Sequence, residues 1–252
     1  MNQIVLPFVE LIVTTKCNLQ CMDCSNLIPL YRNAMCDVAL TDVIKSIDAL
    51  LDSVSELTYL KIHGGEPLLS ANIKSILHNA NKREKIKNII VPTNGSYIPK
   101  ESVLSVLGQY APKTKMVISN YESCRDIHQK LIAACQRHNV NYSISKEKSW
   151  YSFGPVQPYG KTEKDLQEQY DRCEMKRFPA MYAGKLYPCA RIAHGIYLGL
   201  ISAVPDWDFD LVNTCAEDRP NLVERFLSLQ LHPACDYCTM DNVRSRKSGE
   251  QP

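Results

Sequence analysis

The chain has 252 residues, of which 45% are apolar and 22% charged, an ordinary composition for a globular protein with a sizeable core. Its 29 basic and 27 acidic residues give a net charge of +2, so it carries no electrostatic footprint for nucleic acid or an anionic membrane. No apolar run approaches the roughly 20 residues of a membrane span, and the start lacks a signal pattern. We therefore expect a cytoplasmic protein with no nucleic-acid or membrane partner, whose eleven cysteines serve metal binding rather than disulfides.

The first two thirds of the chain alternate short β-branched runs with longer segments of helical period. The runs predict strands at Phe8–Thr14, Leu57–Ile62, Asn88–Thr93, Lys115–Ser119 and Val140–Ser145. The segments between them predict helices at Asp42–Ser53, Asn72–Lys82, Glu101–Leu107 and Ile127–His138. This repetition predicts an α/β fold in which a parallel sheet with crossover helices curls into an open, partial TIM-like barrel.

Polar signals follow each expected strand, at the carboxyl edge where barrels of this type collect their reactive groups. In chain order they are Cys17-x-x-x-Cys21-x-x-Cys24, His63-Gly64-Gly65-Glu66-Pro67, Thr93-Asn94-Gly95-Ser96, Ser119-Asn120-Tyr121 and Ser145-Lys146. Because polar residues follow five strands at the same edge of the sheet, we expect them to form one shared ligand site.

The three cysteines Cys17, Cys21 and Cys24 can hold three irons of a four-iron cluster and leave the fourth iron open for chemistry. The alternative is half of a zinc site, although zinc generally takes four ligands. The loop resembles the cluster loop of the radical S-adenosylmethionine (SAM) enzymes. In that family, SAM chelates the open iron and is cleaved to a 5′-deoxyadenosyl radical, which abstracts hydrogen from unactivated C–H bonds. The resemblance implies a partial (β/α)6 TIM-like barrel.

Gly64-Gly65-Glu66-Pro67 is the second match to this family. Adjacent glycines let the backbone approach a ligand closely, and proline fixes the exit from the turn. By resemblance, the segment binds the methionine amino group of SAM, and Asn94 and Ser119 contact its ribose or carboxylate. The chain departs from the family at Asp23, where an aromatic residue usually covers the adenine, so adenine recognition is left to backbone groups and neighbours such as Tyr97.

Residues 150–162 read as a linker, and a second group of cysteines follows it. Apolar flanks around Ala183-Gly184-Lys185 predict a β-hairpin, and residues 221–230 predict a helix. The cysteines of this region are Cys173, Cys189, Cys235 and Cys238. The arrangement resembles the twitch module, a shortened SPASM extension, and implies an auxiliary iron–sulfur cluster, expected to be of the 4Fe–4S type, for electron transfer or support. A zinc site with four cysteines has the same spacing. The expected domains are a barrel at 1–165, a twitch module at 166–242 and a polar, frayed tail at 243–252.

Short enzymes of this plan include aminocyclitol dehydrogenases, and the chain also resembles radical SAM proteins of sugar and polysaccharide gene clusters. The resemblance therefore implies oxidation of a secondary alcohol to a ketone in a small carbohydrate-like substrate. The auxiliary cluster would accept an electron from the substrate, and flavodoxin or ferredoxin would supply electrons to the first cluster. Arg191 is the candidate to orient the substrate or relay its proton, because it abuts the cluster ligand Cys189. Two alternatives stay open: a sugar epimerase in which Cys124 donates hydrogen, and an enzyme that modifies ribosomally made peptides.

Overall fold

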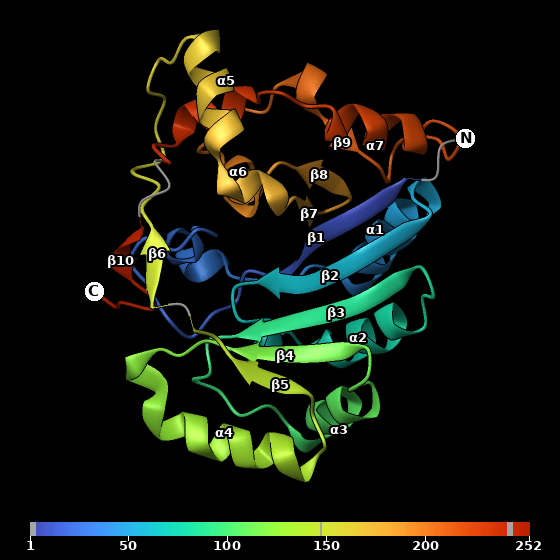
Figure 1. The fold of residues 1–252 in the computed structure, drawn as a ribbon, viewed down its shortest axis with the longest axis vertical. Coiled ribbons are helices and arrows are strands. Elements are labelled where there is room, and N and C mark those ends of the chain that lie inside the picture. Colours follow the sequence, from blue (N-terminus) through green and yellow to red (C-terminus); the bar gives the residue numbers. More distant parts are fainter. Residues whose placement is uncertain (1–3, 147, 241–243) are drawn as a thin grey trace.

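A computed structural model describes residues 4–146, 148–240 and 244–252, with side chains left out for 244–246. Five parallel strands form the main sheet in the order in which they occur along the chain (Figure 1). They are β1 (Val5–Thr14), β2 (Glu56–Gly64), β3 (Ile86–Thr93), β4 (Thr114–Ile118) and β5 (Tyr142–Ile144). The connecting helices are α1 (Leu40–Ser53), α2 (Ile73–Asn81), α3 (Glu101–Gln109) and α4 (Arg125–Arg137). The expected α/β fold with a partial TIM-like barrel is confirmed.

The sixth parallel strand comes from the C-terminal part of the chain and lies beside β1. It is β7 (Ala180–Tyr182), which forms a hairpin with the antiparallel β8 (Lys185–Tyr187), and β9 (Phe209–Asp210) closes that edge of the sheet. The hairpin turn was predicted correctly: Ala183 and Gly184 both have positive φ, which a tight two-residue turn requires. The barrel and the expected twitch module thus share one continuous sheet.

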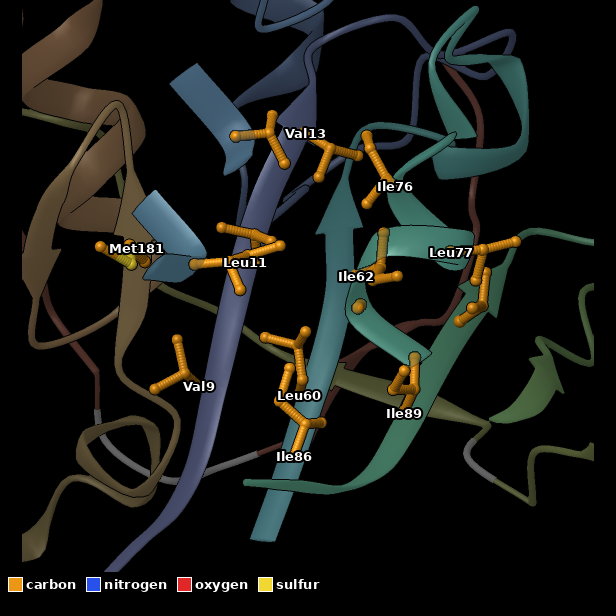
Figure 2. Packing of buried hydrophobic residues seen from close by; sticks show 14 of the residues in the cluster. Val9, Leu11, Val13, Leu60, Ile62, Ile76, Leu77, Ile86, Ile89 and Met181 are labelled. Carbon is orange, nitrogen blue, oxygen red and sulfur yellow. The ribbon is translucent and has the colours of Figure 1, made fainter. Parts of the chain in front are cut away.

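Alternation along the strands separates a helix-facing core from the barrel lumen. Val9, Leu11 and Val13 of β1 point to the same side as Leu60 and Ile62 of β2, in one buried cluster that includes Ile76 and Leu77 of α2 (Figure 2). Glu10 of β1 and Lys61 and His63 of β2 face the other way, into the lumen, and the register pairs Glu10 with Lys61. Burial of the apolar face therefore fixes which side chains line the lumen.

Three helices and a series of short 3₁₀ turns complete the fold. The helices are α5 (Glu163–Arg172), α6 (Ala190–Tyr197) and α7 (Arg219–Leu227). The 3₁₀ turns are Ile28–Leu30, Arg32–Ala34, Pro67–Leu69, Glu122–Cys124, Glu174–Arg177, Pro205–Trp207 and Pro233–Tyr237. Helix α5 was not expected from the sequence, and the proposed domain boundary after residue 165 falls inside it. Among the described residues, no helix is long and apolar enough to cross a membrane.

The C-terminal tail differs from the frayed segment that we expected. Strand β10 (Arg244–Lys247) pairs antiparallel with β6 (Ser149–Tyr151), and the two form a small separate sheet near the barrel mouth (Figure 1). Residues 241–243 of the expected module and tail lie outside the described part of the chain. The backbone of the last residues therefore finds partners that a polar composition does not reveal.

Candidate active site

The first three cysteines lie together on the loop that follows β1. The three thiols are close enough to influence one another's pKa: Cys21 acts on Cys17, Cys24 on Cys21, and Cys17 on Cys24. Burial, the largest cause, raises the pKa of Cys17 and of Cys21 to about 11. Burial also raises the pKa of Cys24. These thiols are protonated in the metal-free protein, so ligation of a metal cluster would have to displace their protons.

The end of β2 supports this loop by close backbone contact. A side chain at Gly64 would place its Cβ 2.0 Å from the Thr14 oxygen, and one at Gly65 would lie 2.2 Å from the Lys16 oxygen. The Gly65 amide donates to the Thr14 oxygen at 2.9 Å, and the Glu66 amide donates to the Lys16 oxygen at 2.8 Å. The glycine pair is therefore required by contact with the cysteine loop itself, in addition to any contact with a ligand.

Glu66 links the end of β2 to the end of β3. Its Oε2 accepts a hydrogen bond from the Asn94 amide at 2.7 Å, and its Oε1 accepts one from the Leu68 amide at 3.2 Å. Burial of this side chain raises its pKa to about 7, although the backbone donors oppose the shift. Pro67, which is also buried, starts the 3₁₀ turn that follows.

Asn94 and Ser119 lie at the neighbouring strand ends, as the strand order predicts. The Asn94 side chain donates to Asn18 at 3.0 Å and lies 3.8 Å from the Cys17 sulfur, so it already helps to hold the cysteine loop. Ser119 lines the lumen beside Tyr121. The structure thus places Gly64, Gly65 and Asn94 against the cysteine loop and Ser119 in the wall of the lumen. The contacts of all the expected residues with SAM stay a prediction.

The second set of cysteines surrounds a small apolar cavity between α5, α6 and the Pro233–Tyr237 turn. Cys173, Cys189, Cys235 and Cys238 all line it. Burial raises the pKa of Cys235 to about 12, raises that of Cys189 well above its usual value and also raises that of Cys173. Four thiols that face one enclosed space suit a fully ligated cluster.

Arg191 lies between the two cysteine sets. It interacts electrostatically with Cys24 of the first set and with Cys189 and Cys238 of the second. Its Nη2 donates to the Gly154 oxygen at 2.6 Å, while its buried Nε has no hydrogen-bond partner among the described residues. Arg191 also lines the lumen, so its guanidinium is placed at the cavity wall between the two cysteine sets.

The donor chemistry of both sets fits iron–sulfur clusters. All seven side chains are thiols, the ligands that such clusters use, and each set brings its members close enough to interact electrostatically. Within the described part of the chain, no three His, Cys, Asp or Glu side chains converge as ligands of a single metal ion. A cluster spreads its protein ligands over several iron atoms, so it does not need such convergence.

The lumen is a cavity of about 450 Å³ whose polar residues our sequence analysis missed. Glu10, which is 7% exposed, accepts a bond from Lys61 Nζ at 2.6 Å, and both side chains line the cavity. His63 lines it nearby: its Nε2 lies 2.9 Å from Asn26 Nδ2, and its buried Nδ1 has no partner among the described residues. Charged residues within otherwise apolar strands were the available signal, but only the register shows that they meet.

Aromatic and apolar side chains form the rest of the lumen wall. The wall includes one cysteine of the second set, Cys189, together with Ser25, the neighbour of Cys24. The apolar and aromatic part consists of Phe8, Ile90, Pro92, Val117, Tyr121, Trp150, Phe153, Met175, Phe178 and Ala190. A polar pair enclosed by aromatic faces suits a small ring that carries hydroxyl groups.

Cys124 does not line the lumen: it is 2% exposed and ends a 3₁₀ turn before α4. Its sulfur lies 3.7 Å from Ser123 Oγ, and burial raises its pKa. It interacts electrostatically with Cys21 and Glu66. Its role as a hydrogen donor stays a prediction.

No family model matches the chain. A GTP 3',8-cyclase of Clostridium acetobutylicum is 28% identical over 96 residues, which cover 38% of this chain and 29% of that protein. The GTP 3',8-cyclase of Limosilactobacillus fermentum is 26% identical over 102 residues, which cover 38% of this chain and 28% of that protein. The match thus spans less than a third of the length of these curated relatives.

Among solved structures, hexahistidine-tagged anSMEcpe with bound AdoMet (SAM) aligns with a TM-score of 0.53 at 14% identity, over 92% of this chain and 82% of that one. BtrN in complex with AdoMet and 2-DOIA aligns with a TM-score of 0.48 at 15% identity, over 100% of this chain and 98% of that one. At 14% identity the likeness to anSMEcpe shows the fold alone, a fold shared with a protein that binds AdoMet. The matches to the two cyclases agree with the resemblance to radical SAM enzymes in the sequence.

Proposed function

We propose that this chain oxidises a secondary alcohol of a small carbohydrate-like molecule to a ketone. The observation that carries the proposal is the single lumen bordered by both cysteine sets, through Ser25 next to Cys24 and through Cys189. When bound, SAM and its cluster on Cys17, Cys21 and Cys24 would supply the hydrogen-abstracting radical, and an auxiliary cluster would accept the remaining electron. A substrate in this lumen would have both within reach.

The polar groups of the lumen support a substrate that carries adjacent hydroxyl groups. The Glu10 carboxylate is an acceptor and the Lys61 ammonium beside it is a donor, a pair that matches two neighbouring hydroxyls. In this proposal Glu10 takes the hydroxyl proton, because it is the carboxylate among the residues that line the cavity. Arg191, which lines the lumen, orients the substrate oxygen rather than taking its proton, since a guanidinium is a poor proton acceptor.

The bonds and electrons of the net reaction balance. The substrate carbon would give a hydrogen atom to the deoxyadenosyl group, the hydroxyl would give its proton to Glu10, and Cys173, Cys189, Cys235 and Cys238 would hold the auxiliary cluster that accepts the remaining electron. SAM, cleaved with one electron from the first cluster, would leave as methionine and 5′-deoxyadenosine. The same proposal includes flavodoxin or ferredoxin as the electron donor to the first cluster. It also includes a cytoplasmic location, where the cysteines stay reduced.

Isotope and mass analysis tests the reaction. Anaerobically reconstituted protein with SAM and a reductant is incubated in heavy water with a panel of aminocyclitols and monosaccharides. Dehydrogenation gives a product two mass units lighter than its substrate, whereas epimerisation leaves one solvent deuterium on an isomer of the substrate. The Glu10→Gln variant should keep forming 5′-deoxyadenosine but lose the ketone. A deuterated isomer from the wild type would overturn the dehydrogenase proposal.

A further inference from the structure

The last described residues bind directly to the cysteine loop. The Met22 amide donates to the Glu250 oxygen at 2.8 Å, and the Gln20 amide donates to Oε1 of Gln251 at 2.7 Å. Between these two bonds, Nε2 of Gln251 donates to the Cys21 sulfur at 3.0 Å. We call residues 247–251 the C-terminal strap.

The orientation of the Gln251 amide follows from its partners. Its NH₂ group donates to the Cys21 sulfur and also to the Gly249 oxygen at 2.9 Å, while its oxygen accepts from the Gln20 amide. Turning the amide over would put its oxygen against the Gly249 oxygen and its NH₂ against another donor. All three contacts therefore require an N–H directed at the sulfur.

Backbone hydrogen bonds and close packing hold the strap at the mouth of the barrel. Strand β10 leads into it from its pairing with β6, and the Ser248 amide donates to the Lys148 oxygen at 3.0 Å. Gly249, with φ of 70°, lies on the ring of Tyr121, where an added Cβ would come within 2.4 Å of a ring carbon. This close packing fixes the backbone from which Gln251 reaches Cys21.

A hydrogen bond to a ligand sulfur alters the redox behaviour of an iron–sulfur cluster. The reduced cluster carries more negative charge than the oxidised one, so an N–H donor stabilises the reduced form and raises the reduction potential. We propose that Gln251 is a positioning residue that raises the reduction potential of the cluster held by Cys17, Cys21 and Cys24. The inference rests on the proposed role of Cys21 as a cluster ligand, and not on the substrate.

A redox titration of the full chain, reconstituted without substrate and followed by electron paramagnetic resonance, measures this potential. Gln251→Met removes the donor at similar length, and Gln251→Glu replaces it by an acceptor with negative charge. We expect the potential to become more negative in the order wild type, Gln251→Met, Gln251→Glu. The control Glu250→Gln changes a side chain of the strap but keeps the backbone bond to Met22, and it should shift the potential less than Gln251→Met does. A Gln251→Met potential equal to or above that of the wild type would overturn the proposal.

The contact between Gln251 and Cys21 is tested separately in metal-free protein. This test remains decisive even if a variant cannot bind the cluster. The N–H of Gln251 donates to the Cys21 sulfur and lowers the pKa of that thiol. Because the thiolate is the form that reacts, and methionine fills a similar space, Gln251→Met should decrease the rate of Cys21 alkylation several-fold relative to Cys17, measured by mass spectrometry of peptides. Equal Cys21 rates in the wild type and Gln251→Met would remove the contact on which the proposal depends. If Gln251→Met loses its cluster, Gln251→Glu replaces it in the titration. Neither readout involves product formation, so failure of the dehydrogenase proposal can be distinguished from failure of the proposal for Gln251.

Discussion

Glu66 shows how one buried side chain holds two strand ends together. Both of its carboxylate oxygens accept backbone N–H bonds, from Leu68 and Asn94, and a glutamine has only one acceptor oxygen. Its pKa of about 7, raised by burial, means that a nearby ammonium group, such as the one in SAM, would favour the charged form. The residue is thus suited both to structure and to ligand binding.

We predict that Glu66→Gln lowers the free energy of unfolding of the metal-free protein by about 1–3 kcal/mol, because one buried amide loses its acceptor. Urea denaturation followed by circular dichroism measures the change. Glu224→Gln on the exposed side of α7 is the matched control and should change stability by less than about 0.5 kcal/mol. Equal stability of the wild type and Glu66→Gln would contradict this role.

His194 makes stability depend on pH. Burial lowers its pKa to about 3, and its Nδ1 lies 2.7 Å from the Tyr31 hydroxyl. Because the folded pKa is depressed, the unfolded chain binds this proton first, so the contribution is fully present above pH of about 6.5 and is lost as the pH falls towards about 3. Between pH of about 6.5 and 4.5 the loss amounts to about 3 kcal/mol, at roughly 1.4 kcal/mol per unit.

The prediction is a shallower pH dependence in the variant His194→Gln, which cannot take up the proton. Urea denaturation of metal-free wild type and variant at several pH values between about 4.5 and 7.5 measures the two slopes. The variant should be less stable at neutral pH, where its packing is imperfect, but should lose less on acidification. Parallel curves would show that another group is responsible.

At the scale of elements, short β-branched runs predicted β1 to β5, because these strands bury apolar side chains in the core. Helix α5 was missed because only Tyr170 of its ten residues is buried, which leaves almost no apolar period. Its capping box between Thr162 and Asp165 was the available signal. The Glu10–Lys61 pair and the strap depend on strand register and on contacts across most of the chain, which local sequence does not encode.

The contact between the glycine turn and the cysteine loop gives a sharp test at this scale. In Gly65→Ala, the new Cβ would lie 2.2 Å from the Lys16 oxygen and 3.1 Å from Cβ of Cys17, so the loop must move. We expect the variant to lose the iron of the first cluster and keep that of the second, about half of the total, measured by iron analysis after reconstitution. In Gly199→Ala the new Cβ meets nothing within 4 Å, although the φ of 70° strains an alanine there. This control therefore carries strain without a clash and should bind iron as the wild type does. Full iron content in Gly65→Ala would contradict the structural role of the turn.

At the scale of the whole molecule, the two cysteine sets belong to one body because β7 pairs with β1. The sequence indicated two modules in succession, and the structure brings the members of each cysteine set together. It did not indicate that the second module extends the barrel sheet, because pairing between distant strands depends on how the chain packs. The shared sheet fixes the lumen between the two sets.

Metal analysis tests this arrangement. If both sets hold four-iron clusters, anaerobically reconstituted protein should carry about eight irons per chain. A variant with alanine at Cys17, Cys21 and Cys24 should keep about half of that iron, bound by the second set. Zinc in place of the residual iron would reject an auxiliary iron–sulfur cluster.

The central claim is that the loop of Cys17, Cys21 and Cys24 holds a cluster that cleaves SAM. The most direct measurement is 5′-deoxyadenosine formation by reconstituted protein supplied with SAM and dithionite under anaerobic conditions, quantified by liquid chromatography and mass spectrometry. The account predicts 5′-deoxyadenosine from the wild type and none from the triple alanine variant, with circular dichroism showing that the variant is folded. Cleavage of SAM by the triple variant at the wild-type rate would contradict the claim.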